Sequence, residues 1–255
     1  MPYTKTTVIA GKTIEIFKHY SARYKPKGMT RQANRKETPE DVKKINQRQA
    51  ENRLRWKMNT NFGEGDWHIV LTYRRDNRKR LAEAKKDLDL FIRRARRLYR
   101  NEGEELKYIA VTESQSSAPH HHLVINGAVD ISKLTKLWEW GRPHLTPLDG
   151  SGDYGRLASY LIKETSRTFG TAKAVSKLRY TCSRNLKEPI IHREIIGSSR
   201  WQEEPRAVKG YYIAGEVERG IHEMTGYPYL HYTMVRLPDI QKKTRLRWRA
   251  KRIKE

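Results

Sequence analysis

The pattern of apolar and polar positions divides the middle of the chain into alternating strands and helices. The run Trp67–Tyr73 is apolar and β-branched, which is typical of a buried strand. Glu105–Glu113 and His120–Asn126 have the same character. Between the first two runs, apolar residues recur at helical spacing over Arg78–Arg100. The pattern therefore predicts a strand, a helix and two further strands.

Three more elements follow along the chain. We predict a second helix over Ile131–Trp140, a weaker strand over Arg142–Leu148 and, after a glycine-rich break, a third helix over Arg156–Thr168. The order β-α-β-β-α-β predicts an α+β fold of the ferredoxin-like, split-βαβ type, with an antiparallel sheet. That topology places both crossover helices on one sheet face, so we expect the third helix to cover the open face.

The flanking segments complete the predicted domain organisation, with the core at 66–180. Residues 1–65 form a basic extension with one helix, because Thr38 suits the N-cap and Pro39 the first helical position. The body of this helix is mostly charged, so we expect it to lie on a solvated surface or on DNA. Residues 181–255 form a C-terminal extension.

The C-terminal third of the chain is patterned less clearly. Thr171–Tyr180 favours a helix, and Ala207–Val217 and Tyr229–Leu237 predict strands that would form an added hairpin. The tail Gln241–Glu255 is a basic run with one tryptophan. Such runs are typical of disordered arms and of helices that form on nucleic acid.

The charge balance points to the partners of this protein. Lys and Arg number 53 and Asp and Glu 29, a formal net charge of +24 at pH 7. This excess favours polyphosphate backbones or anionic surfaces as partners. Cys182 is the single cysteine, which excludes an intrachain disulfide and a cysteine zinc site. No run resembles a signal peptide or a membrane span, so we expect a soluble cytoplasmic protein.

The three consecutive histidines at the start of the third predicted strand are candidates for metal ligands. Side chains alternate along a strand, so His120 and His122 share a face and His121 points the other way. A hairpin would return the Glu113 carboxylate close to His120. Two imidazoles and one carboxylate can hold Mn²⁺ or Mg²⁺, with Zn²⁺ also compatible. The alternative is an exposed polar strand end that binds nothing.

The third predicted helix carries a candidate nucleophile. Tyr160 and Lys163 are three residues apart and share a helix face. If that face covers the sheet, the Tyr160 phenol would look onto the histidines, where it could attack a metal-bound phosphate while Lys163 lowers its pKa or binds the phosphate. Tyrosine is also an ordinary core residue on helices, and that interpretation remains open.

Together these motifs resemble the HUH endonucleases, and among them the replication initiators of rolling-circle plasmids and small single-stranded DNA phages. The resemblance covers roughly Trp67–Thr168: a first strand ending in Leu-Thr-Tyr, the segment PHHHLVI, and a Tyr-x-x-Lys helix. It implies His120, His122 and Glu113 as metal ligands and Tyr160 as nucleophile. Two departures are His121, where the family usually has an apolar residue, and a single suitable tyrosine on the helix.

The resemblance implies a metal-dependent, site-specific single-strand DNA endonuclease that nicks and rejoins through a 5′-phosphotyrosine to start rolling-circle replication. A relaxase, a single-strand transposase and a non-enzymatic nucleic-acid-binding protein are the alternatives. No Walker motif is present, so a host helicase would unwind the single-stranded or cruciform origin. The oligomeric state stays open. The candidate DNA-binding residues are Tyr73, Arg74, Arg75, Arg184 and Trp248, and all six tryptophans are candidates for stacking on unpaired bases. Core packing is the alternative, which is favoured for Trp67 and Trp138 and stays open for Trp56 and Trp248.

Overall fold

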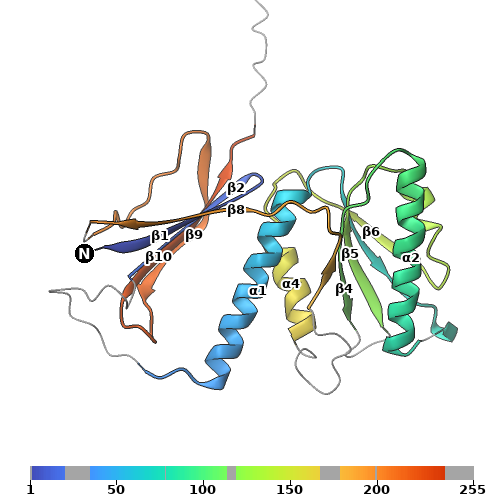
Figure 1. Cartoon of the computed structure of the whole chain (residues 1–255), viewed down its shortest axis with the longest axis horizontal. Helices are drawn as coiled ribbons and strands as arrows, with labels where there is room; N and C mark the ends of the chain where they lie inside the picture. Colours follow the sequence, from blue (N-terminus) through green and yellow to red (C-terminus); the bar gives the residue numbers. More distant parts are fainter. Residues whose placement is uncertain are drawn as a thin grey trace, which may run out of the picture.

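The computed structural model describes residues 2–20, 35–77, 79–113, 119–166, 179–198 and 200–238. In this part of the chain it contains four α-helices and two antiparallel sheets of five strands each. Figure 1 shows the helices α1 (Pro39–Asn61) and α4 (Gly155–Ser166) between the two sheets, and α2 (Leu81–Asn101) on the outer side of one sheet. The predicted α+β class is confirmed.

The core sheet is built from the central part of the chain. Its strand order is β6-β3-β5-β4-β7, and the pairs are antiparallel. The first four of these strands have the order of the split-βαβ arrangement, and the two-residue strand β7 is added at one edge. The strands are β3 (Trp67–Leu71), β4 (Tyr108–Glu113), β5 (His120–Ile125), β6 (Pro143–Pro147) and β7 (Thr181–Cys182).

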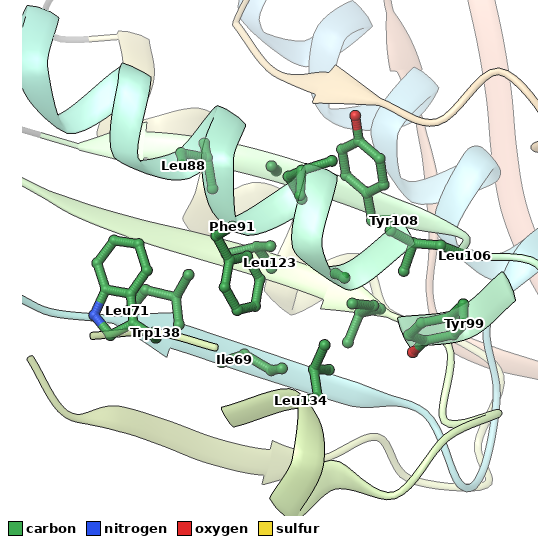
Figure 2. Close-up of a cluster of buried hydrophobic side chains, with 14 residues drawn as sticks. Ile69, Leu71, Leu88, Phe91, Tyr99, Leu106, Tyr108, Leu123, Leu134 and Trp138 are labelled. Carbon is green, nitrogen blue, oxygen red and sulfur yellow. The ribbon is translucent and has the colours of Figure 1, made fainter. Parts of the chain in front are cut away.

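One face of the core sheet is covered by α2 and by the short helix α3 (Ile131–Thr135). Figure 2 shows Leu88 and Phe91 of α2 packed with Trp138 against residues of the strands. The second helix was predicted to reach residue 140 and ends earlier. The chain leaves the helix so that Trp138 is buried and donates its indole N–H to the Thr72 carbonyl, at 2.8 Å.

The other face of the core sheet is covered by α4, as predicted, and also by α1. Thr38 caps α1 and Pro39 begins it, also as predicted. The expectation that this helix lies on a surface or on DNA is wrong for its second half. Leu54 and Met58 are fully buried against α4 and the sheet. Apart from Asp41, the charged residues of the helix lie at exposed or partly exposed positions, which is why composition alone suggested a solvated element.

The terminal sheet joins the two ends of the chain. Its order is β8-β1-β2-β10-β9, so strands from before α1 pair with strands from after residue 180. The hairpin predicted in the C-terminal region is present as β9 and β10, whereas the N-terminal strands were not predicted. The strands are β1 (Tyr3–Ala10), β2 (Thr13–His19), β8 (Ile190–Ile196), β9 (Tyr211–Ile221) and β10 (Pro228–Arg236).

The terminal sheet is attached to α1 through close contacts. The loop between β1 and β2 has Gly11 at φ +57°, and a Cβ there would lie 1.9 Å from the Asn59 carbonyl oxygen. Glu15 of β2 is buried and accepts hydrogen bonds from Arg55 (2.6 Å) and from the indole of Trp56 (2.8 Å). These contacts fix the sheet to the helix that in turn packs on the core sheet.

Two predicted segments lie outside the described residues, namely most of the helix at 171–180 and the basic tail at 241–255. Within the described ranges, none of the helices combines the length and the apolar character that crossing a bilayer requires.

Candidate functional site

The three histidines of β5 divide between the two faces of the core sheet, as their alternation predicts. His121 is wholly buried on the α2 face, where Tyr73 Oη and Thr112 Oγ1 lie 3.1 and 2.9 Å from its ring nitrogens. His120 and His122 lie on the α4 face. His121 is therefore a core residue, and burial together with its two histidine neighbours lowers its pKa to about 3.

Glu113 completes a cluster with the two histidines of the α4 face. Glu113 pairs with His120 in the antiparallel register of β4 and β5. The hairpin therefore brings the carboxylate close to His120, as predicted. Glu113 Oε2 lies 3.1 Å from His120 Nε2 and 3.6 Å from His122 Nε2. One ligand atom from each of the three residues lies within 4.8 Å of the others. We call these three residues the histidine cluster.

His68 of β3 is a fourth member of the site that the sequence analysis missed. Its Nε2 lies 3.2 Å from His122 Nδ1, and the two rings are nearly parallel at 5.4 Å between centroids. This contact occupies one nitrogen of His122 and orients the other toward Glu113. The position of His68 in the alternation of β3, on the same face as His122, was the available signal.

The buried histidines of the site are electrically neutral near pH 7. Burial, followed by the proximity of His120 and His68, lowers the pKa of His122 to about 3. Burial also lowers the pKa of His68. A neutral imidazole offers a lone pair, which is the form that binds metal ions.

The donor set fits a divalent cation. His122 Nε2 is buried without a hydrogen-bond partner, an arrangement that costs free energy unless the atom has a further ligand. One ligand atom from each of His120, His122 and Glu113 lies within 4.8 Å of the other two. The cluster can therefore hold a metal ion, with His68 as the outer partner that metal-binding histidines commonly have.

Tyr160 of α4 lies over this cluster. Its ring is 5.4 Å from the His122 ring, between centroids, at an interplanar angle of 83°, and the side chain is 45% exposed. Lys163, one turn further along α4, is also exposed. Tyr154, just before the helix, is buried and donates its hydroxyl to the Asp149 carbonyl, so it is directed away from the site.

The remaining predicted DNA-binding residues are spread over the molecule. Arg74 and Arg75 are exposed and follow β3 at the sheet end where Glu113 and His120 lie. Tyr73 points to the opposite face, toward His121. Arg184 follows Ser183, whose N–H donates to the carbonyl of Tyr108. Tyr108 begins β4 and Glu113 ends it, about 16 Å further along the strand, so Arg184 lies far from the histidine cluster. Trp248 lies outside the described residues.

Most of the tryptophans considered for base stacking have structural contacts. Trp138 is buried, and Trp56 donates to Glu15. Trp201 stacks on Tyr20 at 4.8 Å between ring centroids. Trp67 and Trp140 are partly buried and pack against the core next to α2.

One known family matches the part of the chain that holds this site. Residues 66–168 match the model of a family described as replication-associated protein ORF2/G2P. The matched segment is about two fifths of the chain and contains β3, the histidine cluster and Tyr160. Neither the curated proteins nor the solved structures gave a match. The family match indicates a replication-associated function and an interaction with DNA.

Proposed function

We propose that this protein is a metal-dependent, site-specific single-strand DNA endonuclease that initiates rolling-circle replication. The observation that carries the proposal is the position of Tyr160 over a cluster of two histidines and a carboxylate, in which Nε2 of His122 is buried without a hydrogen-bond partner. The family match, which covers the same residues, favours replication over conjugation or transposition.

The proposed reaction is a transesterification. The Tyr160 oxygen attacks a backbone phosphorus, the bond from phosphorus to the 3′ oxygen breaks, and the proton that the phenol loses is balanced by one that the departing 3′ oxygen takes up. The products are a 5′-phosphotyrosine and a free 3′-hydroxyl, so one phosphodiester replaces another and the strand can later be rejoined. Bound Mn²⁺ or Mg²⁺ would supply the positive charge that polarises the phosphate.

The other residues of the site have positioning roles in this proposal. Glu113, His120 and His122 hold the cation, and His68 orients His122. Lys163 binds the phosphate or favours the phenolate, since it is exposed one helical turn from Tyr160. Arg74 and Arg75 at the same sheet end bind flanking phosphates of the single-stranded or cruciform origin. Strand separation is assigned to a host helicase.

The test is a denaturing gel that detects a covalent protein–DNA adduct. The full chain is incubated with single-stranded and supercoiled DNA of its own replicon, with Mn²⁺ or with EDTA. We expect an adduct with Mn²⁺ that is absent with EDTA and absent in Tyr160→Phe. Tyr212→Phe, which changes an exposed tyrosine of β9, is the matched control and keeps the adduct.

Two results would contradict the proposal. An adduct that persists in Tyr160→Phe would place the nucleophile elsewhere. Salt-sensitive DNA binding without an adduct under any metal would leave a basic DNA-binding protein, which is the non-enzymatic alternative.

A further inference from the structure

The edge strand β8 is an unusual feature of the terminal sheet. It pairs with β1 on one side and forms the end of the sheet on the other. Three of its isoleucines, Ile190, Ile191 and Ile195, are 55%, 45% and 54% exposed. An edge strand presents unpaired backbone groups, so a long, flat and apolar edge is a template for pairing with another strand.

The other three sheet edges in the described residues have features that block such pairing. β9, at the opposite edge of the terminal sheet, is irregular where it faces His231 and Thr233 and has Gly215 at φ +71°. In the core sheet, β6 begins and ends with proline, and β7 has only two residues. β8 pairs with β1 over seven consecutive residues without a register shift and contains neither proline nor glycine.

The sequence of β8, Ile-Ile-His-Arg-Glu-Ile-Ile, is close to symmetric about Arg193. In an antiparallel pair of two identical strands centred on this residue, isoleucine would face isoleucine at both ends. His192 would face Glu194 of the second copy, and Glu194 would face its His192. Aliphatic pairs and a His–Glu pair directly across two strands are favourable. A strand that complements itself satisfies the condition for a two-fold symmetric contact.

We propose that β8 is a self-association surface, at which two copies of this chain join their terminal sheets edge to edge in an antiparallel, two-fold symmetric dimer. The partner at this edge is a second copy of the chain, because the sequence of β8 pairs favourably with itself when the second strand runs in the opposite direction. The register of β1 and β8 places Ile191, Arg193 and Ile195 on the α1 side of the sheet, with Val8. The α1 side of one copy would therefore continue into the α1 side of the other.

Three electrostatic features set the strength of this contact. Arg193 would face Arg193 of the second copy, which is unfavourable, and Glu194 already binds Lys5 of β1 at 2.7 Å. Each chain also has a net charge of +24. Both repulsive contributions are screened by salt, so the dimer becomes tighter as the ionic strength rises. Association through bridging DNA has the opposite salt dependence.

The dimer would supply what a single chain lacks in the proposed function. α4 carries one tyrosine, and one nucleophile completes one transesterification. A second copy would bring a second Tyr160. This consequence rests on the proposed nicking activity, whereas the dimer itself does not. The experiment below contains neither DNA nor metal, so its failure and the failure of the proposed function are distinguishable.

The first test is sedimentation velocity of the nucleic-acid-free full chain at about 0.1 M and about 0.5 M NaCl. We expect a monomer–dimer equilibrium that shifts toward dimer at the higher salt. Ile195→Lys should weaken it on the order of tenfold or more, because it places a charge opposite Ile191 of the second copy. Tyr212→Lys, on the other edge strand and 46% exposed, is the matched control and leaves it unchanged.

A second test fixes the register. In a Cys182→Ser background, Arg193→Cys places two thiols opposite each other at the proposed axis, within the reach of a disulfide. We expect a cross-linked dimer on mild oxidation, and none for Arg219→Cys on β9. A chain that stays monomeric at both salt concentrations overturns the proposal. So does a dimer that is equally sensitive to Ile195→Lys and Tyr212→Lys, or one that disappears only when residues 239–255 are removed.

Discussion

In the part of the chain that the structure describes, two groups of histidine and glutamate side chains can be compared, and they have different neighbours. In the histidine cluster, Glu113 faces His120 and His122. In the terminal sheet, His231 lies 3.5 Å from Glu15 and 3.5 Å from Glu218. We call this second group, with the α1 residues that bind it, the junction cluster.

The neighbours decide what each group can do. In the junction cluster α1 supplies N–H donors, since Arg55 and Trp56 donate to Glu15 and Arg48 donates to Glu218. Those carboxylates are compensated by protein cations and join a sheet to a helix. In the histidine cluster the carboxylate faces two imidazoles, and burial lowers the pKa of His122 to about 3, so that His122 keeps a lone pair for a cation. Among the described residues, that cluster is the one with metal-binding geometry.

The largest effect that separates the two clusters is expected on DNA cleavage. His122→Asn removes a proposed ligand and should reduce formation of the covalent adduct on the order of a hundredfold or more. His231→Asn changes the histidine of the junction cluster and should leave the adduct yield close to that of the wild type. Quantified denaturing gels, run below the melting temperature of both variants, give the comparison. An equal loss of adduct in His122→Asn and His231→Asn would contradict a specific role of the histidine cluster in cleavage.

The next effect is on the stability of the fold, and here the larger loss is expected from the junction cluster. Arg55→Met leaves Glu15, which is 1% exposed, without its cation. Removing one partner of a buried ion pair is strongly destabilising, so the free energy of unfolding should fall by about 3 kcal/mol. Urea denaturation followed by circular dichroism measures this. A loss of less than about 1 kcal/mol in the free energy of unfolding would show that the Arg55–Glu15 ion pair contributes no more than a surface ion pair does.

Metal binding should stabilise the fold through one cluster only. At a Mn²⁺ concentration about 100 times the dissociation constant, the wild type gains about 2.7 kcal/mol, and His231→Asn gains as much. Glu113→Gln should gain little, because a neutral amide replaces the charged ligand. Thermal unfolding with Mn²⁺ and with EDTA checks this. Equal stabilisation of Glu113→Gln would place the ion elsewhere.

The smallest effect concerns acid. Burial raises the pKa of Glu218, but His231 and Arg48 outweigh it, and the net pKa is lowered from 4.5. A carboxyl group whose pKa is lower in the folded state contributes stability above pH 4.5, and this contribution is lost as the pH falls below that value. Glu218→Gln should therefore flatten the acid limb of stability between about pH 5 and 3, by less than about 1 kcal/mol because the pair is exposed. Unfolding curves at several pH values measure the slope.

Much of the core region could be predicted because its signals are local. The helical spacing in α2, the capping residues of α1 and the alternation in β5 each reside in one short segment. The pairing of Glu113 with His120 followed from a hairpin with a short connection. The position of Tyr160 followed from topology, since a split-βαβ sheet leaves one face open.

The rest depends on contacts between distant parts of the chain. β1 and β2 pair with β8 and β10, nearly the whole sequence away, and no local pattern specifies such partners. The role of Glu15 in β2 also depends on a distant residue, because its buried carboxylate is bound by Arg55 of α1. His68 was missed because its role comes from its neighbour across the sheet, His122, and not from its neighbours in sequence.

The most direct test of the account is to identify the residue that becomes linked to DNA. The adduct formed with Mn²⁺ is digested with trypsin and nuclease, and the modified peptide is sequenced by tandem mass spectrometry. We predict a nucleotide phosphate on Tyr160 in the peptide Leu157–Lys163, which lies between two tryptic sites. A phosphate on any other tyrosine, or no modified peptide despite metal-dependent cleavage, would contradict the assignment of Tyr160 as the nucleophile.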